Sequence, residues 1–189
     1  MDNYTRATQA GRLAIIFGSF QILYGLLAVF FPYSSETTYG WDEVLWIVST
    51  VGMACAAIGI LALGAGKPSW LAWVGGIAVI LGVLIRIVAS VFVLMRLSWD
   101  PITLILSSIL LLLGGMLILG IALLRGDKVR GWRAWTPVIV TISGFIVAAL
   151  FSVNLYIHHI LLGLWGFSWM LVGYVAVSYV HGSRSTTAV

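Results

Sequence analysis

The stretch from Trp70 to Met95, WLAWVGGIAVILGVLIRIVASVFVLM, constrains the fold more than any other part of the chain. As an α-helix it is roughly 39 Å long, which is enough to cross a hydrocarbon core of about 30 Å with some tilt. Its one charged residue, Arg86, lies on the same helical line as Gly75, Gly82 and Ala89. The sequence therefore predicts a membrane-spanning helix that points a guanidinium towards its packing partners.

The composition agrees with a chain dissolved in lipid. Hydrophobic residues make up 61% of the sequence and charged residues 8%, whereas a soluble domain carries about a quarter charged residues. The net charge of +4 comes from basic residues scattered between apolar runs, a pattern that does not indicate a nucleic-acid partner. Cys55 is the single cysteine, so no internal disulfide can form.

Six apolar runs predict an all-α, polytopic membrane bundle, because lipid offers no partner to free backbone groups. We expect one transmembrane domain over residues 1–189. The final break depends on Asn154 and His158–His159 alone, so five helices with a bent last helix is the alternative. Residues 59–67 resemble residues 120–128, and three consecutive helical hairpins would explain the likeness. The six helices are expected near residues 11–32, 43–64, 70–95, 101–124, 135–154 and 157–180.

Basic residues predict the orientation, because cytoplasmic loops carry the excess of lysine and arginine. With the N-terminus inside, the inner segments hold eight basic residues and the outer segments only Arg96. Both termini are therefore expected in the cytoplasm, in a multi-pass protein of the cell membrane, of the bacterial inner-membrane type. The inner residues are Arg6, Arg12, Lys67, Arg125, Lys128, Arg130, Arg133 and Arg184; the outer acidic residues are Glu36, Asp42, Glu43 and Asp100.

Small residues recur every seventh position in several of the expected helices. In lipid, helices associate by close van der Waals contact, and small residues let the backbones approach. The period of seven favours left-handed crossings in a compact bundle. The series are Gly11, Gly18 and Gly25; Gly52, Gly59 and Gly66; Gly75 and Gly82; Ser107 and Gly114; and Gly166 and Gly173.

The segment GSFQILYGLLAVFFP at residues 18–32 runs from Gly18 through Gly25 to Pro32. It resembles the glycine-to-glycine-to-proline helix of HdeD-like proteins, which are small bacterial six-helix membrane proteins built as three hairpins and linked to acid-stress tolerance. The likeness covers this segment and, beyond it, the architecture. It departs at the third and fifth helices, which lack the same proline-terminated ending, and at Arg86, which replaces an apolar position. The resemblance implies a non-enzymatic, stress-related or accessory role and carries over no catalytic residues.

Polar residues on the small-residue faces form the candidate site. Counted inward from the outer loops, Ser49 and Ser107 lie roughly 9 Å deep, and Gln21 and Arg86 roughly 14–16 Å deep. His159 lies seven residues before Gly166 on the last helix. These depths nearly coincide, so we expect an outward-open pocket in which Arg86 receives a carboxylate, a phosphate or a lipid headgroup.

Two other roles remain open for Arg86. It could extend outward to Asp100, the nearest candidate counter-ion, or to a headgroup, and so stabilise the bundle. It could also contact another subunit in a homo-oligomer or a larger membrane complex. The partners expected from the sequence alone are membrane lipids.

His158 and His159 suggest a metal site, a pH sensor or simple interfacial residues. Adjacent helical residues point about 100° apart, and no third ligand shares a suitable spacing with them, so no metal or other cofactor is expected. Catalytic motifs are absent from the sequence. The leading expectation is a small non-enzymatic membrane protein, accessory or stress-associated. The alternatives are a small-anion carrier or channel, and a membrane-embedded enzyme acting on lipid or isoprenoid substrates through Asp100, His158 or His159.

Overall fold

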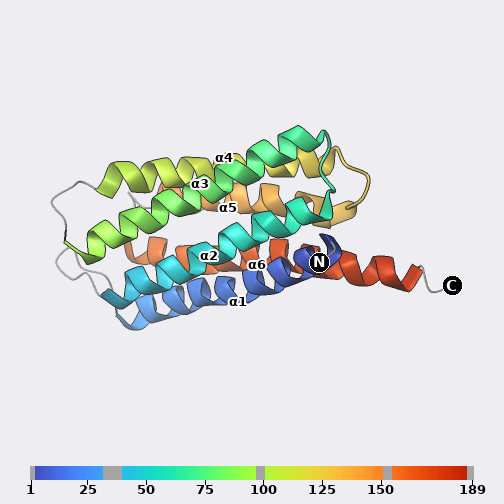
Figure 1. The fold of residues 1–189 in the computed structure, drawn as a ribbon. Coiled ribbons are helices and arrows are strands. Elements are labelled where there is room, and N and C mark those ends of the chain that lie inside the picture. Colours follow the sequence, from blue (N-terminus) through green and yellow to red (C-terminus); the bar gives the residue numbers. More distant parts are fainter. Residues whose placement is uncertain (1–2, 32–39, 97–100, 151–154, 187–189) are drawn as a thin grey trace.

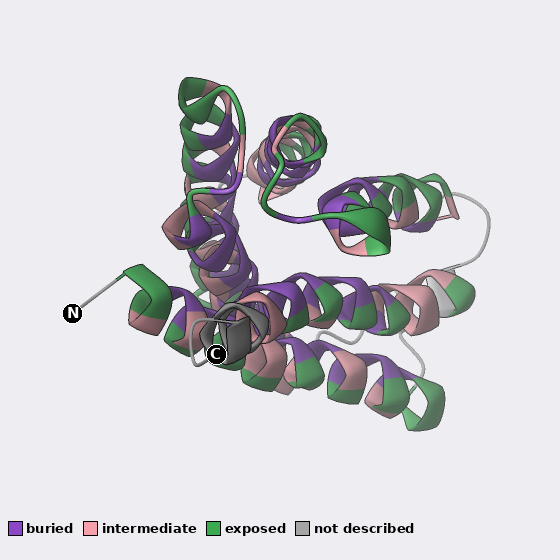
Figure 2. Cartoon of the chain, turned by 90° about the vertical axis from the view of Figure 1, so that its right-hand side faces the viewer, coloured by how far each residue is buried: buried purple, intermediate pink, exposed green. Residues whose placement is uncertain are grey.

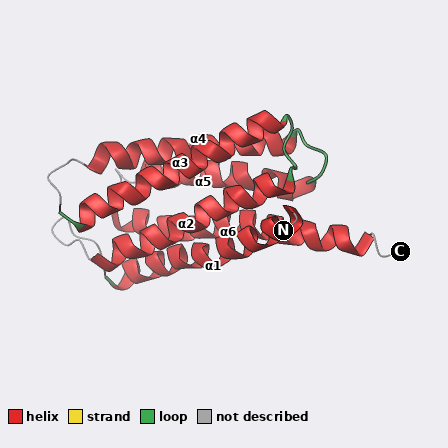
Figure 3. Cartoon of the chain, viewed as in Figure 1, coloured by secondary structure: helices red, strands yellow, loops and turns green. Residues whose placement is uncertain are grey.

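The computed structural model describes residues 3–31, 40–96, 101–150 and 155–186, and within these residues it contains helices and no strand (Figure 1, Figure 3). Six helical segments are long and apolar enough to cross a membrane, η1 and α5 together forming the fifth. The chain is therefore an all-α, multi-pass membrane protein, and the prediction of six helices is confirmed. The elements are α1 (Asn3–Phe30), α2 (Gly40–Leu63), α3 (Ser69–Leu94), α4 (Pro101–Leu124), the short 3-10 helix η1 (Gly131–Trp135), α5 (Thr136–Leu150) and α6 (Leu155–Thr186).

The helix boundaries differ from the predicted ones mainly at α1 and α6. α1 begins eight residues before the predicted residue 11, because the polar residues ahead of the apolar run continue the helix. Thr8 donates a hydrogen bond to the carbonyl of Tyr4 one turn back, at 3.0 Å. α6 likewise continues beyond residue 180. Hydropathy locates the membrane-embedded part of a helix and not its polar extension.

The helices form a ring in chain order (Figure 1). Each helix packs on the next one, α1 and α6 close the ring, and α2 also contacts α6. α1 begins and α6 ends at the same end of the bundle, together with the α2–α3 and α4–α5 connections. We call this the terminal end. The opposite end, where α2 and α4 begin and α3 finishes, is called the distal end.

Glycines lie at the closest approaches between α1 and α6. A Cβ added to Gly25 would lie 2.5 Å from the Cα of Gly163, and one added to Gly11 would lie 2.6 Å from the carbonyl oxygen of Gly173. Both distances are shorter than a real Cβ tolerates. The two backbones are therefore in direct contact along this seam, which no larger residue would allow.

The face of α4 that meets α3 differs from the expected one by one residue. A Cβ on Gly115 would lie 2.7 Å from the carbonyl oxygen of Gly75, whereas nothing lies within 4 Å of a Cβ on Gly114. Ser108 is fully buried, and its carbonyl oxygen lies against Gly82. The line of Ser107 and Gly114 is therefore not the contact face. Because Gly114 and Gly115 are neighbours, a seven-residue count could start from either.

Two connections are joined at the terminal end. The backbone N–H of Lys67 donates to the carbonyl of Ala122 at 2.8 Å, and its ammonium pairs with Asp127 at 2.6 Å. Lys128 donates to the carbonyl of Leu63 at 3.4 Å. This carbonyl is among the last four of α2, which have no partner within a helix. The α2–α3 and α4–α5 connections are thus held to each other.

Each helix has one buried side and one exposed side. The buried sides of the helices face one another, and the exposed sides, which carry large apolar residues such as Ile16, Leu84 and Leu110, face outward (Figure 2). An outward apolar surface of this kind suits lipid and not water.

Candidate functional site

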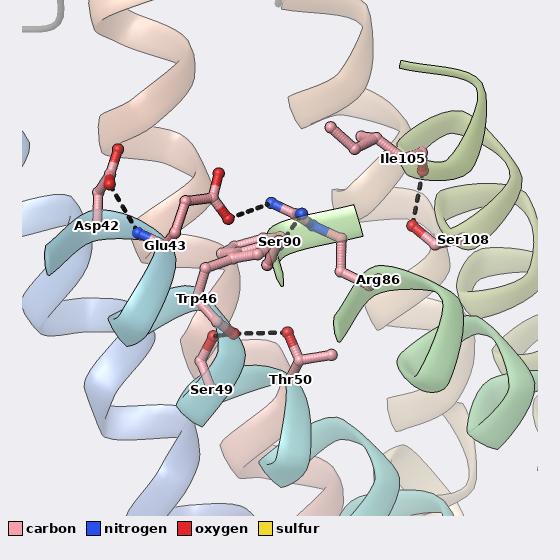
Figure 4. Close-up of polar contacts among 9 residues, drawn as sticks. All are labelled: Asp42, Glu43, Trp46, Ser49, Thr50, Arg86, Ser90, Ile105 and Ser108. Carbon is pink, nitrogen blue, oxygen red and sulfur yellow. Dashed lines mark hydrogen bonds and ion pairs between the residues drawn. The ribbon is translucent and has the colours of Figure 1, made fainter. Parts of the chain in front are cut away.

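Arg86 is one of two charged residues, with Asp42, that are buried within the described helices. Its residue is 8% exposed, and its guanidinium Nη2 lies 3.5 Å from the Oε2 atom of Glu43 on α2 (Figure 4). Glu43 lies in the first turn of α2 and Arg86 about 12 Å before the end of α3. The glutamate therefore reaches inward from the distal end and the arginine reaches outward. An arginine in the hydrocarbon region costs several kcal/mol unless it is paired, so the two helices depend on this contact.

Trp46 and Ser90 complete the surroundings of the guanidinium. Nη1 of Arg86 donates to Oγ of Ser90, one turn along α3, at 2.8 Å. The centre of the Trp46 ring lies 5.1 Å from the guanidinium carbon, within the range of a cation–π contact. The positive charge is thus enclosed by a carboxylate, a hydroxyl and an aromatic face.

Some hydrogen-bond donors at this site have no acceptor among the described residues. A guanidinium has five N–H donors, and within the described residues Arg86 donates to Glu43 and Ser90. Trp46 is 7% exposed, and its indole Nε1 has no hydrogen-bond partner among the described residues. Buried polar groups in native proteins are nearly always paired. Unused donors beside a positive charge are suited to an acceptor that brings negative charge.

Aromatic rings connect this cluster to α1 and α6. Tyr24 of α1 lies 5.9 Å from Trp46 and 6.0 Å from His159 of α6 between ring centres. His159 in turn lies 5.4 Å from His158. Tyr24 and Asp42 are also close enough to Arg86 to interact with its charge. Four helices therefore contribute to the site: α1, α2, α3 and α6.

Gln21 is fully buried one turn deeper than Tyr24 along α1. Its Nε2 donates to the carbonyl of Leu162 on α6 at 2.9 Å. Its Oε1 has no partner among the described residues. Gln21 therefore joins α1 to α6 and leaves one acceptor in the interior.

The other predicted site residues have different surroundings. Ser49 is buried and donates to the carbonyl of Trp46 within its own helix, at 2.9 Å. Ser107 donates to the carbonyl of Thr103 on the exposed side of α4, at 2.8 Å, while Ser108 takes the buried position. Asp100 lies outside the described residues. The structure thus connects Arg86 to His159 through the rings of Trp46 and Tyr24. The hydroxyl of Ser107 is instead bonded within α4.

The sequence interpretation missed Glu43 as the carboxylate nearest Arg86. It counted Glu43 as the first residue of its helix and grouped it with the loop acids, although α2 begins at Gly40. A signal was available. Glu43 and Trp46 are three residues apart and so share a helix face, and acidic residues are favoured in the first turn.

His158 joins two helices. His158 Nδ1 lies 2.8 Å from the carbonyl oxygen of Val147 on α5, which fastens α6 to α5. Within residues 3–31, 40–96, 101–150 and 155–186, no three histidine, cysteine, aspartate or glutamate residues lie close enough to hold a metal ion.

The fold and this cluster together define a small multi-pass membrane protein with a buried arginine–glutamate pair in its distal half. Comparison with known proteins adds no relative: no family model, no curated protein and no solved structure matches the chain.

Proposed function

We propose that this protein is a non-enzymatic membrane protein whose distal half binds an anionic group, a carboxylate or a phosphate, at Arg86 and Trp46. The observation that carries the proposal is that, among the described residues, the indole N–H of Trp46 has no acceptor and the guanidinium next to its ring donates only to Glu43 and Ser90. An oxyanion supplies several acceptor lone pairs at once. It would satisfy both donors within a low-dielectric surrounding, where such bonds are stronger than in water.

The setting of the site supports an amphiphilic source for that group. Tyr24 and Trp46 lie beside Arg86 in the cluster. The outer surfaces of the helices around them carry apolar residues. A lipid headgroup and a free small anion share the same recognition chemistry, so the experiment must separate them.

The proposal includes the orientation. Support comes from the basic residues of the two joined connections at the terminal end and of the start of α1, because cytoplasmic segments carry an excess of lysine and arginine; the terminal end is therefore proposed to face the cytoplasm. The anion site would then open towards the outer face of a bacterial inner membrane. An accessory or stress-related role, as in the HdeD-like proteins that residues 18–32 resemble, would fit a binding site without catalytic groups.

The test is binding of defined anions to the full-length protein in nanodiscs of neutral phosphatidylcholine. Calorimetric titration with butyrate and with inorganic phosphate measures free anions, and native mass spectrometry of nanodiscs that contain phosphatidylglycerol measures headgroup retention. We expect at least one of these anions to bind, and Trp46→Phe, which keeps the ring but removes the N–H, to weaken that binding several-fold.

Arg86→Gln should abolish binding, while Arg96→Gln provides the matched control. Arg96 also lies at the distal end, but its side chain is exposed, so its loss should leave the affinity unchanged. If Arg86→Gln folds normally and binds every probe as well as the parent protein, the proposed site is wrong.

A small-anion carrier is a second candidate, favoured by Gln21. Its Oε1 has no partner among the described residues, is completely buried and lies one turn further inside than Tyr24, where it could accept a hydrogen bond from the protonated form of a carboxylate passing through the bundle. Proteoliposome flux of butyrate that disappears in Arg86→Gln would support transport, and binding without flux would leave the binding function alone.

A further inference from the structure

We propose that the site takes up its anion together with one proton, which Glu43 receives, so that the ligand class is a weak monocarboxylic acid. The inference rests on the proposed function of Arg86. It starts from a simple charge balance: Arg86 contributes +1 and Glu43 contributes −1, so the pair is neutral before any ligand arrives.

An added anion would disturb this balance. The side chains of Arg86 and Glu43 are 9% and 15% exposed, and charge repulsion is much stronger here than in water. Asp42 is also buried, at 6% exposure, and its Oδ1 accepts the backbone N–H of Glu43 at 2.7 Å. A third negative charge beside two carboxylates is therefore disfavoured unless one of them is neutralised.

Glu43 is the carboxylate to be neutralised, because the ligand competes with it directly. It holds Arg86 through one long contact of 3.5 Å, beyond the usual 2.7–2.9 Å of a charge-assisted hydrogen bond. Asp42 accepts a backbone N–H in the first turn of a helix, where negative charge is stabilised. An anion that takes over Arg86 leaves Glu43 without its cation, and a proton from solvent then neutralises Glu43.

The exchange balances without covalent chemistry. One carboxylate and one proton enter, the Arg86–Glu43 contact is replaced by an Arg86–ligand contact, and protonated Glu43 keeps a donor for a nearby acceptor. The net charge of the site does not change. A divalent phosphate would need two protons for the same result, which is why a monocarboxylate is the better match.

Other titratable groups around Glu43 have to be considered. The helices packed on α2 are α1, α3 and α6. They present Tyr24, Arg86 and His159 to this region, with His158 behind His159, and α2 itself contributes Asp42. Histidine is the side-chain type whose ordinary pKa lies closest to neutral pH, so His159 is the alternative proton acceptor to test with its own variant.

The experiment counts protons. Butyrate is titrated into the full-length protein in phosphatidylcholine nanodiscs between pH 6 and pH 8, in two buffers with different ionisation enthalpies. The difference between the two heats gives the protons taken up per bound anion. We expect one proton per butyrate and a Kd that rises about tenfold per pH unit, as the linkage of one proton requires.

Substitutions identify the residue that takes up the proton. Glu43→Gln should bind butyrate with no proton uptake and with a Kd independent of pH, while Asp42→Asn and His159→Gln should retain one proton. The measurement on the parent protein needs no variant, so it stands even if Glu43→Gln fails to fold.

The outcomes separate this inference from the proposed function. Butyrate or phosphate that binds in an Arg86-dependent manner without proton uptake overturns the inference and leaves the binding site intact. A proton that persists in Glu43→Gln also overturns it. If neither the parent protein nor Glu43→Gln binds any probe at any pH, the proposed function itself fails.

Discussion

The guanidinium of Arg86 on α3 lies 3.5 Å from the carboxylate of Glu43 on α2, and both side chains are largely buried. Removing one member of such a pair leaves the other as an uncompensated charge, which costs about 3–5 kcal/mol. We expect Glu43→Leu and Arg86→Leu each to lower the free energy of unfolding by about 3 kcal/mol. The double variant should be close to the parent protein, because neither charge then remains. Thermal unfolding in nanodiscs measures the cycle, and additive losses in the double variant would show that the two residues are not coupled.

The seam between α1 and α6 should not tolerate even one added methyl group. Gly25→Ala places a Cβ 2.5 Å from the Cα of Gly163, and overpacking of this kind costs about 1–3 kcal/mol. Gly114→Ala is the matched control on α4, since nothing lies within 4 Å of its Cβ. Gly114→Ala should leave the stability unchanged or raise it, because alanine favours a helix over glycine by up to about 1 kcal/mol. Equal effects at both positions in an unfolding assay would contradict the close contact.

Ser107 and Ser108 give a second matched pair. Ser108 is fully buried, whereas Ser107 lies on the exposed side of α4. Ser108→Leu should separate α4 from α3 near Gly82 and lower the unfolding temperature by several degrees, since a loss of about 1 kcal/mol shifts it by about 2–4 °C. Ser107→Leu should leave it unchanged. The reverse ranking would mean that α4 is rotated from the position described.

The Lys67–Asp127 pair predicts a specific titration. Lys67 donates a hydrogen bond to the Asp127 carboxylate, and its charge adds to the effect, so the pKa of Asp127 is lowered from its ordinary value of 3.8. A carboxyl group whose pKa is lower in the folded state stabilises the fold above its unfolded pKa and loses that contribution as the pH falls. Carbon-13 NMR should place the Asp127 midpoint below 3.8. Lys67→Ala should move it back up, and so should high salt, because both groups are exposed. A midpoint unaffected by Lys67→Ala would show that the pair does not form.

Cysteine labelling tests the placement of the two ends. In a Cys55→Ser background, Lys67→Cys and Lys128→Cys should react with a membrane-impermeant maleimide from one side of the membrane, and Arg96→Cys from the other. The physical reason is that α3 crosses the bundle between Lys67 and Arg96. Labelling of all three positions from one side would exclude this arrangement.

How far the sequence predicts this molecule differs from one feature to the next. Hydropathy identified all six helices, because lipid permits few structures and each run is long. The rotation of α4 was wrong, since adjacent glycines at 114 and 115 leave a seven-residue count ambiguous and only packing chooses between them. The sequence analysis also did not identify Gly163 as a packing residue, although it lies three residues before Gly166 and contacts Gly25 directly.

The candidate site shows the same limit. Arg86 and Gln21 were recognisable as polar residues within apolar runs, and both are buried as polar residues of a helix interface. The partner of Arg86 was not recognised, because the sequence does not show where α2 begins or how far a glutamate side chain extends along it. Asp100 lies outside the described residues, so its proposed pairing with Arg86 stays a prediction.

The closure of the ring by α1 and α6 bears on how the protein is made. During synthesis α1 leaves the ribosome before α6, which covers its glycine face, so Gly11, Gly18 and Gly25 lie against lipid or the insertion machinery until α6 has been made. A chain that stops before α6 would leave the glycine face of α1 open to contact with other helices in the membrane. The contact between α1 and α6 can therefore form only after α2, α3, α4 and α5 have all been made.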